Sequence, residues 1–448
     1  MCQGAESLNR RILALAVPSL GSLLAEPLMV LADTAMIGHV GTAELAGLTI
    51  ASSINVLIVG LCIFLVYTTT AVASRQLGSG NKTAAIKTGI DSLWLGLLVG
   101  VAVTVILFSA AEHFIAFFNA SAQVSSYGVT YLRWAAPSMI GMMAVLAGTG
   151  ALRGQLDTRT PMAISMTGAA LNVALNAALI FTAGMGVAGA ALGTTIASTL
   201  MGAAFTVKIV AGARAVGPVT LRPDFSGIMG ALAGGVPLMI RTLTMQTIII
   251  ATLWVAAAQG DTAIASRQIV ANTWTVTANL FDALAIAAQA LIGYELGSAD
   301  RGALRALIRR ISLWGAGSGV ALAAIQAPLA GLWPAIFTTN PEVHSASTVA
   351  LLVAAVFLPL AGLVFMWDGI LIGANDAWYL ALAGIINLAI YAPVLAAVWY
   401  TTHGSRSPTD FALLWGCYCG VFFLARAATL GYRLRGNTWM RLPENPNS

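Results

Sequence analysis

Six of the ionisable residues that lie inside long apolar stretches of the sequence are the best placed to do chemistry. They are Glu26, Asp33, Arg133, Arg241, Asp282 and Asp368. A charged group in the hydrocarbon of a bilayer is costly, so such residues typically carry protons or ions, or pair with one another. Glu26 and Asp33 are seven residues apart, about two helical turns, which places them on one helix face.

The stretch that holds both acids also contains Pro18. A proline inside a helix removes one backbone hydrogen bond and weakens the helix locally. We therefore expect Asp33, and secondarily Glu26, to bind the coupling proton or ion, with Pro18 as a hinge. The alternative is a structural, hydrogen-bonded Glu26 and a static bend at Pro18.

Arg241 lies in the middle of an apolar stretch and requires a counter-charge. Asp282 and Asp368 are the acids expected at a similar depth, and such a pair is as often structural as functional. Arg133 lies near the start of its stretch, where its side chain can reach water.

Asn172 and Asn176 are four residues apart, so they lie on one face of a helix. Buried amides either hold membrane helices together or line a polar cavity. Both interpretations remain open from the spacing alone.

Other motifs carry no chemistry. The sequence GSGNKT at 78–83 lacks the Gly-Lys pair of a phosphate-binding loop. The four histidines and four cysteines have no metal-ligand spacing, and no hydrolase motif occurs. We therefore expect no enzyme, no cofactor and no metal site.

The composition requires a membrane protein. Hydrophobic residues make up 58% of the 448 residues and charged residues only 9%. A soluble domain carries about 25% charged residues because its surface faces water. The net charge of +5 could indicate a nucleic-acid partner, but the distribution of the basic residues gives it another origin.

Twelve stretches are long and apolar enough to cross a bilayer as helices. They lie near 11–37, 46–73, 90–115, 127–151, 161–184, 187–211, 228–257, 265–293, 308–332, 346–373, 378–401 and 409–432. If the N-terminus is cytoplasmic, 18 of the 22 basic residues fall in cytoplasmic segments and two, Arg267 and Arg406, in outer ones. The positive-inside rule then predicts that both termini are cytoplasmic. This bias explains the basic charge without nucleic acid.

The two halves of the chain resemble each other at one constant spacing, which we call the repeat offset. It is the spacing that separates Pro18 from Pro237, and it also matches the segment from Gly150 to Asp157 with Gly369 to Asp376 at four positions. Six helices in each half give two parallel repeats, a design found in transporters. We expect an N-terminal lobe at 1–211, a cytoplasmic linker at 212–227 and a C-terminal lobe at 228–448.

Several segments resemble the multidrug and toxic compound extrusion (MATE) family. These are AEPLMVLADTAMIGHVGTAELAGL (25–48), RQLGSGN (75–81), YLRWAAPSM (131–139), GALRGQLDTRTPM (150–162), MIRTLTMQ (239–246) and WDGILIGANDAW (367–378). The Ala-Glu-Pro-Leu and Ile-Arg-Thr runs are similar to the DinF-type, DNA-damage-inducible branch. The resemblance covers nearly the whole chain and implies a MATE-like all-α fold of twelve transmembrane helices in two six-helix bundles.

The resemblance also implies an antiporter that exports drugs or metabolites against an inward flow of H⁺ or Na⁺. It assigns the coupling role to Asp33, with Asn172, Tyr131 and Thr194 beside it and Pro18 at a bend. Asn176 stands where related members have an aspartate, and the glutamate that other branches carry in 228–257 is missing. These differences favour one N-terminal acid over a two-carboxylate network or a C-terminal Na⁺ site.

The leading hypothesis is therefore an H⁺-coupled exporter of small organic molecules in the cell membrane, acting as a monomer. A Na⁺-coupled exporter is the nearest alternative, and a flippase for lipid-linked precursors comes third. Arg241, Asp282, Asp368, Tyr131 and Thr194 are the candidates for the substrate cavity. The sequence does not identify the substrate.

Overall fold

The computed structural model describes residues 2–402 and 408–440, and this part of the chain is helical and contains no strand. His403, Arg406 and Arg441, which the charge analysis places in loops or tails, lie outside the described residues. The α-helices are α1 (Cys2–Gly38), α2 (Thr42–Cys62), α3 (Phe64–Gly78), α4 (Lys82–Ser109), α5 (Ala111–Ala116), α6 (Ala122–Ala135), α7 (Ser138–Gly154), α8 (Arg159–Ala177), α9 (Gly186–Val216), α10 (Phe225–Ala258), α11 (Asp261–Ser298), α12 (Arg301–Leu329), α13 (Pro341–Gly373), α14 (Ala377–Thr402), α15 (Pro408–Cys417) and α16 (Phe423–Arg435). Short π-helical segments, η1 (Ala178–Thr182) and η3 (Tyr418–Phe422), continue α8 and α15, and η2 (Pro334–Ile336) is a 3₁₀ turn.

Each of the twelve expected spans corresponds to one helix or one broken helix. Among the described residues, ten helices are long and apolar enough to cross a membrane, and an eleventh forms if α6 and α7, bent by 54°, are one span. The remaining expected span, 308–332, lies in α12, which begins with four arginines within ten residues. The prediction of an all-α membrane protein is confirmed.

The chain divides into two compact units, each described by itself. The N-terminal unit comprises Ala14–Val236, and the C-terminal unit comprises the residues up to Leu13 together with those from Pro237 onward. The first turns of α1 therefore belong to the C-terminal unit. There, the side chain of Asn9 accepts hydrogen bonds from Arg310 and Trp314, and Arg11 pairs with Glu295 at 3.1 Å.

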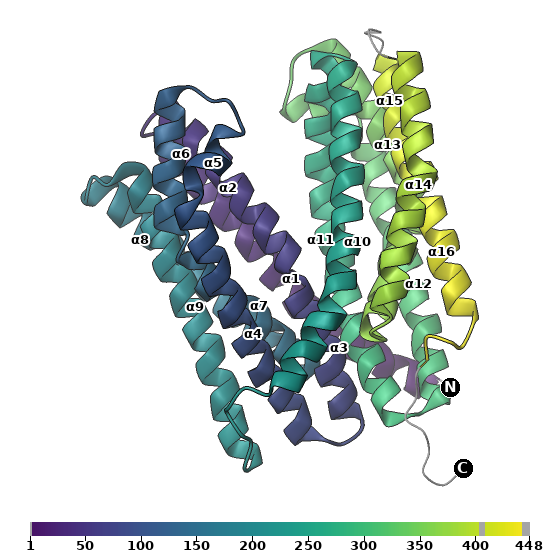
Figure 1. Cartoon of the computed structure of the whole chain (residues 1–448). Coiled ribbons are helices and arrows are strands. Elements are labelled where there is room, and N and C mark those ends of the chain that lie inside the picture. Colours follow the sequence, from purple (N-terminus) through teal and green to yellow (C-terminus); the bar gives the residue numbers. More distant parts are fainter. Residues whose placement is uncertain (1, 403–407, 441–448) are drawn as a thin grey trace. The chain divides into compact units, whose positions relative to one another are not determined.

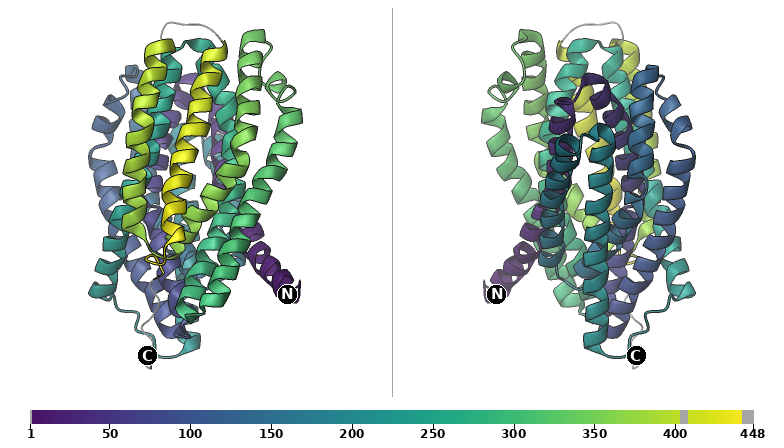
Figure 2. Two further views of the ribbon diagram at one scale, coloured as in Figure 1. Left: turned by 90° about the vertical axis from the view of Figure 1, so that its right-hand side faces the viewer. Right: turned by 90° about the vertical axis from the view of Figure 1, so that its left-hand side faces the viewer.

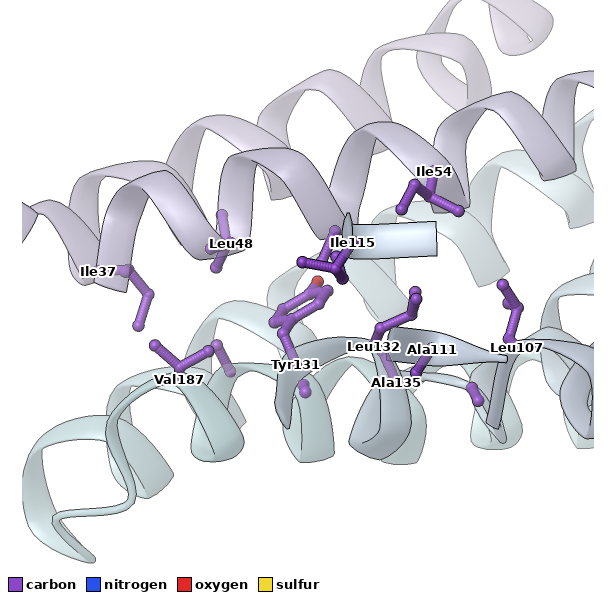
Figure 3. Close-up of a cluster of buried hydrophobic side chains, with 14 of the residues drawn as sticks. Ile37, Leu48, Ile54, Leu107, Ala111, Ile115, Tyr131, Leu132, Ala135 and Val187 are labelled. Carbon is purple, nitrogen blue, oxygen red and sulfur yellow. The ribbon is translucent and has the colours of Figure 1, made fainter. Parts of the chain in front are cut away.

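The N-terminal unit is built around α7, which packs against α3, α4 and α9 (Figure 1). A separate cluster of buried apolar side chains lies in the part of this unit where α2 packs against α6. It includes Ile37, Leu48, Ile115 and Leu132 (Figure 3). Tyr131 lies in this cluster with only 4% of its surface exposed. The apolar packing thus fixes one aromatic side chain that carries a hydroxyl.

In the C-terminal unit, α13 packs against α11, α12, α15 and α16. Figure 2 shows the green and yellow helices of this unit from two further sides. The backbones of α12 and α13 approach each other closely at Gly315 and Gly362. A Cβ atom on Gly362 would overlap the carbonyl oxygen of Gly315, so a larger residue would not fit there. Close backbone approach at small residues is the usual way membrane helices gain packing energy. α13 is thereby held on several sides.

The sequence repeat reappears in the backbone of the turns. Leu156 and Asn375, which the repeat offset relates, have positive φ values of 62° and 58°. Gly80 and Ala299 are related in the same way, with φ values of 83° and 59°. The side chains of Asn81 and Asp300 cap the helices that follow, α4 and α12. These equivalent positions indicate that the two halves share one folding pattern.

The connection between the halves is shorter than the expected 212–227, because only residues 217–224 lie outside helices. The run AGARAV continues α9 to Val216, and Asp224 starts α10 by accepting hydrogen bonds from Ser226. Those bonds hold the pKa of the Asp224 carboxyl below its usual value.

This connection is fastened to α4. Lys87 Nζ donates to the carbonyl oxygen of Arg222 at 2.8 Å, and Trp94 Nε1 donates to that of Leu221 at 3.0 Å. Asp91 accepts from Lys87 at 2.5 Å and from the backbone N–H of Asp224 at 2.9 Å. A nearly buried carboxylate therefore anchors the linker to the N-terminal unit.

Candidate functional site

A chain of polar side chains links α1, α8 and α9 inside the N-terminal unit. Asn176 Nδ2 donates to Asp33 Oδ1 at 2.5 Å and lies 3.4 Å from Asn172 Oδ1. Asn172 Nδ2 in turn donates to Thr194 Oγ1 at 3.1 Å. The structure thus brings together four residues that the sequence and the family resemblance selected.

These side chains are withdrawn from solvent. Asn172 and Asn176 are fully buried, and Asp33 is 8% exposed. A buried carboxylate is unfavourable unless hydrogen bonds or opposite charge compensate it. The amide of Asn176 supplies the donor, so its position controls how readily Asp33 can hold a negative charge.

Local sequence fixes that amide. Asn172 and Asn176 stand one turn apart on α8, and α8 packs along α9. On α9, Gly193 leaves the space that Asn176 occupies, because a Cβ there would overlap Asn176 Oδ1. That oxygen is buried and accepts no hydrogen bond from the described residues. The glycine was not singled out from the sequence, since a glycine contact has no signature without the fold.

Tyr131 reaches the same network from α6. Its side chain interacts with Thr194 and, electrostatically, with Asp33. The ring lies in the apolar cluster (Figure 3). The Tyr131 hydroxyl therefore adds a polar group at the boundary between this apolar cluster and Asp33.

The two acids of α1 have different environments. Asp33 is buried, whereas Glu26 is exposed, and the structure does not bring Glu26 into the chain of hydrogen bonds described above. Seven-residue spacing places two side chains on one face of an ideal helix, but α1 contains Pro27 between them as well as Pro18 near its start. Both prolines lie between the first turns of α1 and Asp33.

The C-terminal unit contains a different cluster. Asp368 on α13 accepts a close hydrogen bond from Arg241 on α10 and another from Arg426 on α16, at 2.5 Å. Of the two acids expected as partners of Arg241, Asp368 therefore makes an ion pair with it, and Asp282 lies half-buried on α11. Arg426 is 3% exposed, although the charge analysis counts it among cytoplasmic residues. Its position inside the stretch 409–432 was the signal that it lies in a membrane helix.

The repeat shows what the C-terminal unit has in place of the acid network. At the repeat offset, Asp33 corresponds to Thr252. The hydroxyls of Thr252 and Tyr391 are 2.9 Å apart and buried. A neutral hydroxyl therefore stands at the position of the carboxylate, so the two halves differ in the chemistry they can perform.

Comparison with known proteins gives the family. The family model MatE matches the chain twice, at residues 18–178 and 237–398. The chain is 28% identical to Protein DETOXIFICATION 44, chloroplastic, of Arabidopsis thaliana. The match covers 88% of this chain and 80% of the length of that relative. It is 27% identical to DNA damage-inducible protein F of Escherichia coli (strain K12), over 97% of this chain and 94% of that one.

A solved structure agrees in fold. The Vibrio cholerae MATE transporter VcmN in its bent form superposes with a TM-score of 0.85 at 22% identity, covering 98% of this chain and 99% of that one. The two matches of the family model begin at Pro18 and Pro237, the same pair that defines the repeat offset. The chain therefore belongs to the MatE family, the multidrug and toxic compound extrusion family that its sequence resembles.

Proposed function

We propose that this protein is a secondary antiporter that exports small organic molecules, drugs or toxins among them, in exchange for H⁺. Membership of the MatE family supports the transporter class. The observation that carries the coupling proposal is the buried Asp33, held by a neutral amide. A proton needs only one such carboxylate.

The proposed cycle follows from the bond between Asp33 and Asn176. An ionised Asp33 accepts the hydrogen bond of Asn176 and ties α1 to α8. Proton entry neutralises the carboxylate and weakens that charge-assisted bond, so α1 repacks at its proline positions and substrate is released outward. Return of the protein to its inward state lets the proton leave and substrate bind again.

Na⁺ coupling is the second candidate. Oxygens of Asp33, Asn172 and Thr194 lie along one chain of contacts and could contribute to a Na⁺ shell. Against it, Asn176 directs its NH₂ group toward Asp33, and a hard cation requires oxygen ligands. A flippase for lipid-linked precursors has no specific observation in its favour.

The orientation and assembly are part of the proposal. The cytoplasmic excess of arginine and lysine supports two cytoplasmic termini in a plasma or inner membrane, and a single chain holds the whole Asp33 network, which supports a functional monomer. Cysteines introduced at Gly41 and His113 in a cysteine-free background should react with an impermeant reagent only from outside. Reaction from inside alone would reverse the orientation.

The test of coupling uses proteoliposomes containing a fluorescent cationic substrate. A pH gradient alone should drive transport by the wild type, and a Na⁺ gradient at matched pH should not. Asp33→Asn should remove pH-driven transport at equal membrane abundance, whereas Glu26→Gln, the exposed acid of the same helix, should retain most of it. Transport that follows Na⁺ and ignores pH would replace the proton assignment, and normal transport by Asp33→Asn would remove Asp33 from the mechanism.

A further inference from the structure

Arg426 is a buried cation with incomplete hydrogen bonding. Its Nη2 donates to Asp368, while its Nη1 is buried and has no partner among the described residues. The same carboxylate also accepts from Arg241. The one acid in hydrogen-bond contact with Arg426 is therefore shared, and only part of its negative charge compensates this guanidinium.

A second incomplete donor lies on α14, the helix that packs against α16. Asn387 on α14 is fully buried, and its Nδ2 also has no partner among the described residues. Thr429 connects the two residues: its hydroxyl lies 3.5 Å from Asn387 Oδ1 and 3.0 Å from the carbonyl oxygen of Arg426. Arg426 and Thr429 are three residues apart on α16, so they share a helix face.

The chemistry of these groups restricts what could bind. Both are N–H donors, and buried donors are nearly always satisfied in native proteins. A ligand at this place must accept hydrogen bonds. A negatively charged acceptor also compensates the guanidinium, which a neutral water molecule cannot do.

We propose that Arg426 and Asn387 form a binding site in the C-terminal unit for a small anion, either chloride or the carboxylate of an organic molecule. The site is separate from the Asp33 network and does not depend on the coupling ion.

Thermal unfolding of the purified full-length protein in detergent tests the site. Sodium chloride, sodium acetate and sodium isethionate are compared at one ionic strength, with isethionate as the bulky reference anion. A ligand that binds only the folded state stabilises it in a saturable way. We expect the Tm to rise by about 2 °C or more in one of the two test salts.

Two variants locate the effect. Arg426→Gln and Asn387→Leu should each lose the anion-dependent shift, and Asn387→Leu leaves the contacts among Asp368, Arg241 and Arg426 in place. Glu112→Gln, an exposed side chain of the N-terminal unit, should keep the shift.

The two test salts distinguish the sources. A shift in chloride alone identifies a halide site, and a shift in acetate identifies carboxylate recognition. An identical Tm in all three salts, or a shift that survives in both site variants, overturns the proposal. Because no transport is measured, neither result depends on whether the protein exchanges H⁺.

Discussion

Asn176 Nδ2 donates a hydrogen bond to Asp33 Oδ1 across 2.5 Å, and the two residues are 143 positions apart in the chain. This contact joins α1, which contains two prolines, to α8. Because a proton on Asp33 changes the strength of the bond, a chemical event at one side chain can alter the packing of a whole helix.

Replacing Asn176 by leucine should leave Asp33 buried without its amide donor. We expect the free energy of unfolding to fall by about 1–3 kcal/mol, the usual cost of an unsatisfied buried polar group. Transport driven by a pH gradient should fall at least tenfold. Thermal unfolding and proteoliposome uptake measure the two effects, and unchanged transport would show that Asn176 does not tune the acid.

Gly193→Ala tests the same contact from α9. The added Cβ would overlap Asn176 Oδ1, so the amide must move. Overpacking of this kind costs about 1–3 kcal/mol, and we expect transport to decline with stability. Gly212→Ala on the same helix is the matched control, because no heavy atom lies within 4 Å of its Cβ position. Equal behaviour of the two variants would contradict the prediction.

Arg241→Ala should destabilise the C-terminal unit, because Asp368 loses one of its two cationic partners. Breaking a buried ion pair costs about 3 kcal/mol or more. The double variant Arg241→Ala with Asp368→Asn should lose further stability, because Arg426 is then left buried without its carboxylate. Arg133→Ala, which breaks the exposed pair with Glu112, should cost less than about 1 kcal/mol. A double variant as stable as Arg241→Ala alone would show that Asp368 does not compensate Arg426.

Asp91→Ala should release the linker from α4, because Asp91 holds both Lys87 and the backbone of Asp224. Chymotrypsin should then cut after Leu221, in the non-helical segment 217–224, several times faster than in the wild type, measured by limited proteolysis in detergent. Glu112→Gln provides the control for general loosening. Cleavage at the wild-type rate would mean that Trp94 and the Lys87 contact with Arg222 suffice to hold the segment.

Much of the architecture follows from the sequence because its signals are local. About twenty apolar residues specify a membrane helix wherever they occur, so the ranges of the expected spans agree closely with the helices. The repeat offset likewise predicts an equivalence of the two halves that the turns at Leu156 and Asn375 reproduce. The candidates Asp33 and Arg241 also follow locally, since an ionisable group in an apolar stretch is conspicuous without a fold.

Tertiary structure alone decided which side chains meet and which acids are buried. Glu26 and Asp33 have the spacing of a shared face, yet one is exposed and the other buried, because burial depends on what packs against α1. Arg426 lies within the expected span 409–432, but only the packing of α16 against α13 brings it to Asp368. Gly193 likewise acquires its role from the amide of a neighbouring helix. Such contacts join positions far apart in the chain, and no local pattern encodes the distance between them.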